Sequence, residues 1–197
     1  NIGGGHPGNW LEWNTDSFPG GHKYLVEELA KKDFKLGLWC GAFWFSDHLE
    51  SFGQMRDALL KVDGEPAVSR PGWSYGEAGL LPPEQRPNVY SLDPTHPKAR
   101  EFLRNVFSTY REWGVRYYML DFLYAVWGCM EFNDYYDMSV IKGPQLLRIG
   151  LDVITEASGP ETYRLSSTGP TFHCINQMAA CRIGNDYGEG RALSPNS

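Results

Sequence analysis

The sequence predicts an α/β fold whose strands run parallel. Two apolar, strand-like runs each end on an aspartate, at residues 115–121 and 179–186. Helical patterns, with apolar residues every three or four positions, lie before and between such runs, most clearly at 97–113 and 139–157. Strands that alternate with helices are typically parallel and covered by those helices. A complete (β/α)8 barrel usually takes about 250 residues, so a 197-residue chain with four readable strands fits an incomplete central portion of one.

Each predicted strand follows a predicted helix or a turn signal. Pro19-Gly20 punctuates the chain before the first helix, and Gly114 separates the second helix from its strand. Thr95 is the candidate N-cap of that second helix, and Ser158-Gly159-Pro160 stops the third. In chain order we expect a helix at 24–32, a strand at 36–41, a helix at 97–113, a strand at 115–121, a helix at 139–157, a strand at 162–167 and a strand at 179–183.

A long segment, residues 43–88, interrupts this alternation. It is rich in Gly and Pro, and segments of that length without periodicity are usually functional or flexible. An open flavodoxin-type sheet is the alternative fold. The sequence argues against it, because no glycine-rich phosphate loop joins an apolar strand to a helix.

Composition narrows the class of ligand. The chain has 18 Lys and Arg against 24 Asp and Glu, a net charge of -6, which argues against nucleic acid as a partner. No apolar run approaches the roughly 18 residues of a membrane span. Aromatic residues make up 14% of the chain, and many Trp residues lie in loop-like sequence. Their faces suit sugar rings as well as core packing, so a neutral polar ligand fits best.

The ends of the chain indicate that it is part of a larger domain. It begins at Asn1 without Met and stops at Ser197 in loop-like sequence, so we expect residues 1–197 to be one catalytic-type domain truncated at both ends. No signal peptide is visible, which favours the cytoplasm slightly and leaves the compartment open. The oligomeric state also stays open, and a homo-oligomer is compatible with the sequence.

The four cysteines lack the spacing of a metal site or a disulfide scaffold. We expect free, mostly buried thiols at all four, with a bridge between the third and fourth as the alternative: Cys40, Cys129, Cys174 and Cys181. The histidines are scattered without metal-ligand spacing, so no metal is expected. Asp93, before Pro94, is interpreted as a structural residue ahead of the helix at 97–113.

Several short motifs, in order, resemble the catalytic barrel of melibiase-type α-galactosidases, glycoside hydrolase family 36 and its relatives. The resemblance covers nearly the whole chain. It is carried by Trp13-Asn14, Phe18-Pro19-Gly20, Gly37-Leu38-Trp39, Leu92-Asp93-Pro94-Thr95-His96-Pro97, Trp113-Gly114, Asp121-Phe122-Leu123-Tyr124 and Arg182-Ile183-Gly184-Asn185-Asp186.

This resemblance implies a retaining hydrolase of terminal α-galactosides that needs no cofactor. The aspartate ending the fourth barrel strand is the nucleophile in that family, and the one ending the sixth is the acid/base; these roles fall on Asp121 and Asp186. Such enzymes pair a carboxylate that attacks the anomeric carbon with one that protonates the leaving oxygen. The readable strands then correspond to about strands 3 to 6. The expected substrate-binding residues are Arg182, Trp39, Tyr124 and Ser167.

One departure from the family pattern keeps alternatives open. Relatives commonly carry a lysine two residues before the nucleophile, and here that position is Met119. The paired aspartates that hold galactose in relatives would lie before the first residue of this chain. The alternatives are a different α-glycoside hydrolase, such as an α-glucan-type enzyme, and a carbohydrate-binding barrel without catalysis.

Overall fold

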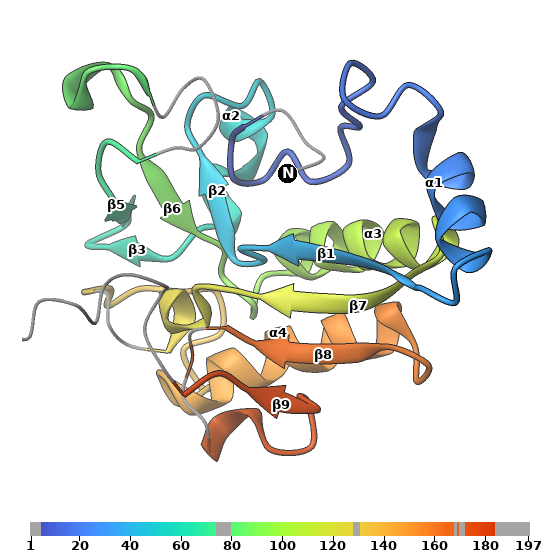
Figure 1. The fold of residues 1–197 in the computed structure, drawn as a ribbon. Coiled ribbons are helices and arrows are strands. Elements are labelled where there is room, and N and C mark those ends of the chain that lie inside the picture. The colour runs from blue at the N-terminus through green and yellow to red at the C-terminus, as the bar shows by residue number, and fades with distance from the viewer. Residues whose placement is uncertain (1–4, 74–79, 128–130, 168, 170–171, 184–197) are drawn as a thin grey trace, which may run out of the picture.

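The computed structural model describes residues 5–73, 80–127, 131–167, 169 and 172–183. A four-stranded parallel sheet crosses this part of the chain in the order β1-β7-β8-β9 (Figure 1). Its strands are β1 (Leu36–Cys40), β7 (Val115–Leu120), β8 (Tyr163–Ser166) and β9 (Ala180–Cys181). All four strands predicted from the sequence are therefore present, and they run parallel. The described residues do not close a barrel.

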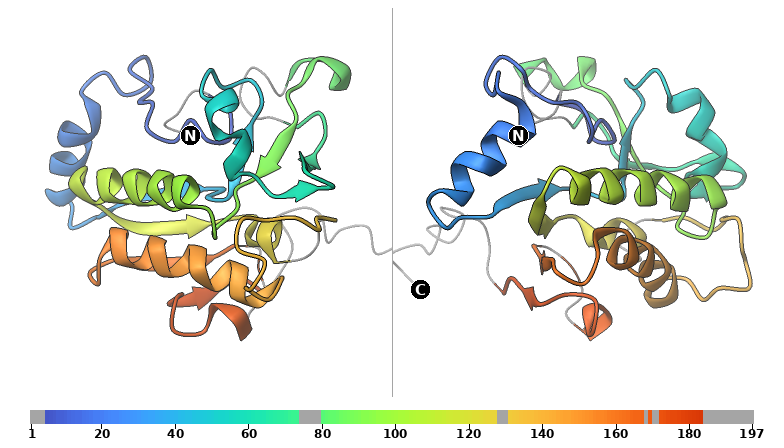
Figure 2. Two further views of the ribbon diagram at one scale, coloured as in Figure 1. Left: turned by 180° about the vertical axis from the view of Figure 1, so that it is seen from behind. Right: turned by 90° about the vertical axis from the view of Figure 1, so that its right-hand side faces the viewer.

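Two long helices cover one face of this sheet, as Figure 2 shows from behind. They are α3 (Pro97–Glu112) and α4 (Pro144–Ser158), and the shorter α1 (Gly21–Ala30) precedes β1. The rings of Tyr118 and Phe107 meet edge to face at 5.4 Å, which packs β7 against α3. Strand side chains alternate between two faces, and the buried Leu38, Cys40 and Leu120 share the helix-covered face.

The opposite face of the sheet is more open. Tyr117 of β7 stacks on Tyr163 of β8 with ring centroids 5.7 Å apart, and Tyr163 is 46% exposed. Trp39, Met119 and Leu165, paired across the strands, are only partly buried. We call this side of the sheet the inner face.

The start of α3 corrects one sequence prediction. Thr95 is not the N-cap: the cap is His96, whose side chain accepts a hydrogen bond from the Lys98 N–H, while the Thr95 hydroxyl donates to Asp93. Pro97 at the first helical position needs no N–H partner, which suits a helix start. The buried stripe of α3 otherwise follows the predicted spacing, with Ala99, Leu103, Val106, Phe107 and Tyr110.

The helix predicted at 139–157 begins later than expected, at Pro144. Before it, the Asp137 carboxylate accepts bonds from the Ser139 N–H and hydroxyl, which forms a local turn instead of a helical one. Gly143 has a φ of 90°, a conformation that L side chains rarely adopt, and it separates this turn from the helix. The end at Ser158, before Gly159 with φ 82°, is as predicted.

The segment 43–88 and the strand after it form small antiparallel sheets, which the sequence did not predict. One has the order β2-β6-β5 and the other joins β3 to β4. We call residues 43–91 the excursion. Its elements are β2 (Trp44–Ser46), α2 (Phe52–Met55), η1 (Arg56–Ala58), β3 (Lys61–Val62), β4 (Glu65–Pro66), β5 (Val68–Arg70), η3 (Pro83–Gln85) and β6 (Val89–Ser91).

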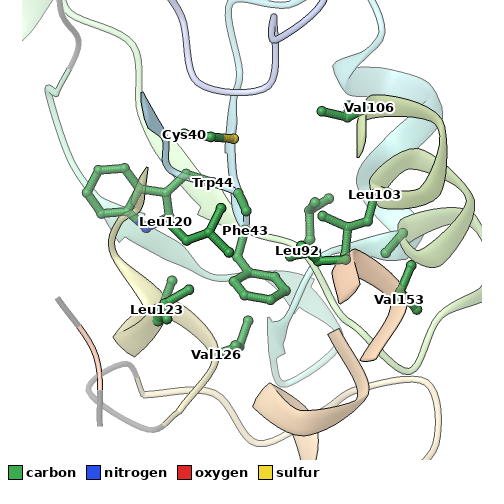
Figure 3. Close-up of a cluster of buried hydrophobic side chains, with 14 of the residues drawn as sticks. Cys40, Phe43, Trp44, Leu92, Leu103, Val106, Leu120, Leu123, Val126 and Val153 are labelled. Carbon is green, nitrogen blue, oxygen red and sulfur yellow. The ribbon is translucent and has the colours of Figure 1, made fainter. Parts of the chain in front are cut away.

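The core joins the excursion to the parallel sheet. Figure 3 shows Phe43 and Trp44 of the excursion beside Leu120 and Leu123, with side chains of α3 and α4 further along. All four of these residues are at most 1% exposed. The two kinds of sheet therefore share one hydrophobic core. In the described part of the chain, no helix is long and apolar enough to cross a lipid bilayer.

Candidate functional site

Asp121 directly follows β7, at the carboxyl end of the parallel sheet. The β7 register pairs Leu120 with Cys40 on one side and Ser166 on the other, so the next residues, Asp121 and Ser167, are neighbours. Three backbone bonds continue the ladder past the strand ends: Asp121 N–H to Cys40 O at 2.9 Å, Ser167 N–H to Leu120 O at 2.8 Å and Arg182 N–H to Ser166 O at 2.8 Å.

These bonds create a polar row, which we define as Asp121, Ser167 and Arg182. Each residue comes from the end of a different strand, in the order β7, β8 and β9. Neighbouring strands lie about 4.8 Å apart, so the row spans about 10 Å from first to last backbone. The sequence predicted all three as site residues, and the fold sets them side by side. Active sites of parallel barrels lie at this end of the strands.

The carboxylate of Asp121 has a fixed orientation. The indole Nε1–H of Trp39 donates to Oδ2 at 2.9 Å, and the Phe122 backbone N–H donates to Oδ1 at 2.8 Å. The residue is only 9% exposed. Charge-assisted bonds to a carboxylate are stronger than neutral ones, so the two donors hold the group in place. Trp39 was predicted to bind substrate, and in the structure its indole N–H donates to Asp121.

Phe122 adopts a left-handed backbone conformation, with φ 55° and ψ 35°. This conformation is costly for a bulky L residue, and such strain often accompanies functional sites. The left-handed conformation of Phe122 ends β7 and precedes the short helix η4 (Leu123–Val126). The Phe122 ring stacks on Trp44 with centroids 3.8 Å apart and an interplanar angle of 8°. The stacking and the Asp121 contact stabilise the turn.

An aromatic wall lies next to Asp121; its members are Trp39, Trp44, Trp73, Phe122 and Tyr124. Tyr124, a predicted substrate-binding residue, meets the rings of Phe122 at 5.9 Å and Trp44 at 6.3 Å. No role was predicted for Phe122 from the sequence. The only sequence signal for Trp44 and Trp73 was that many Trp residues lie in loop-like sequence, but Trp44 is in fact a buried strand residue.

Ser167 brings a buried hydroxyl to the polar row. The residue is 3% exposed, and its Oγ has no hydrogen-bond partner among the residues that the structure describes. Buried polar groups are nearly always paired, with protein or with something bound. A hydroxyl in this position suits contact with a sugar oxygen. Asp186, the predicted acid/base, lies outside the described residues.

Met119 lies on the inner face, two residues before Asp121, paired with Trp39 on β1 and Leu165 on β8. All three are partly buried. This stretch of the inner face is therefore apolar below the polar row, where relatives of the predicted family carry a lysine.

The two buried thiols, Cys40 and Cys174, are unsuited to nucleophilic chemistry. Cys40, Cys174 and Cys181 are free, and the first two are buried, as predicted; Cys129 lies outside the described residues. Burial raises the pKa of the Cys40 thiol well above its usual range and raises that of Cys174 to about 11. A raised pKa keeps the thiol protonated at neutral pH, and the thiolate is the reactive form.

Asp93 is also buried, at 1% exposure, but its carboxylate is occupied by structural bonds. Oδ1 accepts from the Thr95 N–H and hydroxyl, and Oδ2 accepts from the Tyr136 N–H. This arrangement matches the structural interpretation made from the sequence. Within the described ranges, no three His, Cys, Asp or Glu side chains are grouped so as to hold a metal ion.

Comparison with known proteins identifies similar solved structures, while no protein-family model matches the chain. The α-galactosidase TtGalA of Thermus thermophilus, in complex with stachyose, superimposes with a TM-score of 0.71 at 26% identity and covers 92% of this chain. The GH36 α-galactosidase AgaA A355E of Geobacillus stearothermophilus, in complex with 1-deoxygalactonojirimycin, superimposes with a TM-score of 0.57. The sequence identity is 17%, and the match covers 88% of this chain. An α-galactosidase of Lactobacillus brevis superimposes with a TM-score of 0.52 at 17% sequence identity and covers 82% of this chain.

The resemblance to melibiase-type α-galactosidases that the motifs indicated is therefore confirmed. The matched region is a fraction of each larger enzyme. This chain spans 34% of the TtGalA chain, 23% of AgaA and 20% of the Lactobacillus brevis protein.

Proposed function

We propose that this chain is the central part of the catalytic barrel of a retaining α-galactosidase. The observation that carries the proposal is the position of Asp121: a strand-end carboxylate, oriented by two N–H donors, in one row with Ser167 and Arg182. The similarity to TtGalA at 26% identity supports the same assignment.

We infer a (β/α)8 barrel in which the described parallel strands are about strands 3 to 6. Two observations support this. The strands follow one another across the sheet in chain order, and α3 and α4 lie on the same face. An open flavodoxin-type sheet has helices on both faces and a change of strand order, so the observed winding favours the barrel. Residues 1–197 are then one domain that continues beyond both ends.

In the proposed reaction, Asp121 is the nucleophile and Asp186 the acid/base. An oxygen of Asp121 attacks the anomeric carbon and forms a glycosyl ester, while the bond to the leaving oxygen breaks and that oxygen takes a proton from Asp186. A water molecule then gives its proton back to Asp186, attacks the anomeric carbon and releases Asp121. Trp39 and the Phe122 N–H orient the nucleophile in both steps, and Ser167, Arg182 and Tyr124 contact the sugar.

A related α-glycoside hydrolase with a different sugar preference is the second candidate. Met119 favours it, because a thioether on the inner face supplies no hydrogen-bond donor for a sugar hydroxyl. A panel of nitrophenyl α-glycosides distinguishes the candidates by the sugar that gives the highest kcat/KM. Release of no nitrophenol from any member would instead indicate a binding protein without catalysis.

The direct test replaces Asp121 with Asn in the full protein. Asn keeps the shape of the side chain but cannot form the glycosyl ester, so kcat on nitrophenyl α-galactoside should fall by about 10³-fold or more. Asp16→Asn, the same change at an exposed position, is the matched control and should keep wild-type activity. Circular dichroism should show the same fold for both variants. An active Asp121→Asn enzyme would exclude the proposed nucleophile.

A further inference from the structure

The last residue of β5, Arg70, lies against the aromatic wall. Its guanidinium carbon is 5.9 Å from the ring centroid of Trp44 and 5.6 Å from that of Trp73. These two rings meet edge to face at 4.7 Å, so one cation contacts both. Arginine above an indole face is a favourable cation–π arrangement. The contact fixes an otherwise flexible side chain at a defined place in the excursion.

Among the residues that the structure describes, this guanidinium has no ion-pair or hydrogen-bond partner. Arg70 is exposed, and the ion pairs within the described ranges involve other residues: Lys31 with Glu28, Arg56 with Glu65, and Arg148 with Asp152. No hydrogen bond from the Arg70 guanidinium to another described residue is seen. A guanidinium has five N–H donors and matches a carboxylate with two parallel bonds.

Arg70 is connected to the candidate nucleophile by continuous ring contacts. Trp44, beneath the guanidinium, stacks on Phe122 at 3.8 Å, and Phe122 directly follows Asp121. Trp73 also contacts Phe122, at 5.6 Å. The cation therefore lies on the excursion side of Asp121, two aromatic layers away, whereas Ser167 and Arg182 lie on the other side along the sheet.

We propose that Arg70 is a specificity-determining residue that binds a carboxylate on the leaving group of the substrate. This inference rests on the proposed function. The sugar whose anomeric carbon reacts lies over Asp121 and the polar row, and the leaving group extends along the aromatic wall to the guanidinium. Trp73, partly buried, is one of the aromatic rings along this path. The enzyme should then prefer α-galactosides with an acidic aglycone over matched neutral ones.

The test compares two substrates in the full protein, nitrophenyl α-galactoside and its carboxylated nitrophenyl counterpart. Arg70→Met keeps the apolar stem but removes the charge. It should lower kcat/KM for the carboxylated substrate by about 5-fold or more, mainly through KM, and leave the neutral substrate within about 2-fold, because one charge-assisted contact is lost. Arg70→Lys should restore part of the preference. Arg56→Met, which makes the same change elsewhere in the excursion, should leave the substrate ratio unchanged.

A binding measurement separates failure of this inference from failure of the proposed function. If the protein hydrolyses neither substrate, titration of its tryptophan fluorescence with the carboxylated galactoside still reports binding, since Arg70 lies on two indole rings. Arg70→Met should weaken that binding by a similar factor, and 0.5 M salt should weaken wild-type binding as well. Equal affinity, or an equal substrate ratio, in wild type and Arg70→Met would overturn the inference.

Discussion

The parallel sheet and the excursion contribute to the candidate site in different ways. In the sheet, the strand register positions the polar row. The strands β7, β8 and β9 end at paired residues, so the residues that follow them lie side by side. In the excursion, side-chain packing sets the position of the residues: Trp44 is buried and stacks on Phe122, beside the candidate nucleophile Asp121. Backbone pairing therefore positions the candidate nucleophile, and side-chain contacts position its surroundings.

The two regions are also supported differently. The sheet has α3 and α4 behind it, with apolar stripes buried against the strands. The small strands of the excursion expose several side chains, among them Val62 and Val68. The excursion is anchored where it meets the sheet, through Phe43, Trp44 and the Leu92 N–H bond to Phe43 O at 2.8 Å. We therefore expect the exposed strands of the excursion to contribute less to stability than the parallel sheet, and the excursion to determine selectivity.

The largest expected effect on stability is at Leu120, the last residue of β7. It is fully buried on the helix-covered face, so Leu120→Ala should lower the free energy of unfolding by about 2–5 kcal/mol through lost burial and a cavity. Val68→Ala, at a position of β5 that is 41% exposed, should change it by less than about 0.5 kcal/mol. Denaturant titration followed by circular dichroism measures both. Similar losses of unfolding free energy in Leu120→Ala and Val68→Ala would remove this distinction between the sheet and the exposed strands of the excursion.

A smaller effect is expected where the sheet orients Asp121, the candidate nucleophile. Trp39→Phe removes the N–H that donates to Asp121 and keeps a ring on the inner face. A hydrogen bond to a charged group is worth about 1.5–3 kcal/mol, so kcat/KM should fall by about 10- to 150-fold. Steady-state kinetics on nitrophenyl α-galactoside measures this fall in kcat/KM.

The matched control for Trp39 is Trp13→Phe. The Trp13 indole donates to Phe18 O and packs on Trp113 at the end of α3, away from Asp121. Its loss should leave kcat/KM within about 2-fold. If the two variants lost the same activity, Trp39 would be acting through general packing and not through the carboxylate.

The sequence predicted the part of the molecule that follows regular patterns. Periodic apolar residues located the four parallel strands and the helices α3 and α4. Strand-end polar residues located Asp121 and Ser167, and the family resemblance added Arg182. These predictions succeed because helix and strand periods reflect burial on one face. The family motifs then assigned roles that patterning alone does not give.

The remaining features depend on contacts between distant segments. Nothing local in the sequence indicates that Trp44 stacks on Phe122, or that Arg70 lies on Trp44 and Trp73. The left-handed φ of Phe122 is likewise unexpected for an aromatic residue, since only its surroundings make it tolerable. The cap of α3 was misassigned because Thr95, a good capping residue, uses its hydroxyl on Asp93 instead.

The most direct test of the central claim is to trap the covalent intermediate. A fluorinated galactosyl fluoride, whose ester forms faster than water cleaves it, should label the protein once, and peptide mass spectrometry should locate the sugar on Asp121. A label on any other carboxylate, or turnover without any covalent adduct, would contradict the assignment of Asp121 as the nucleophile.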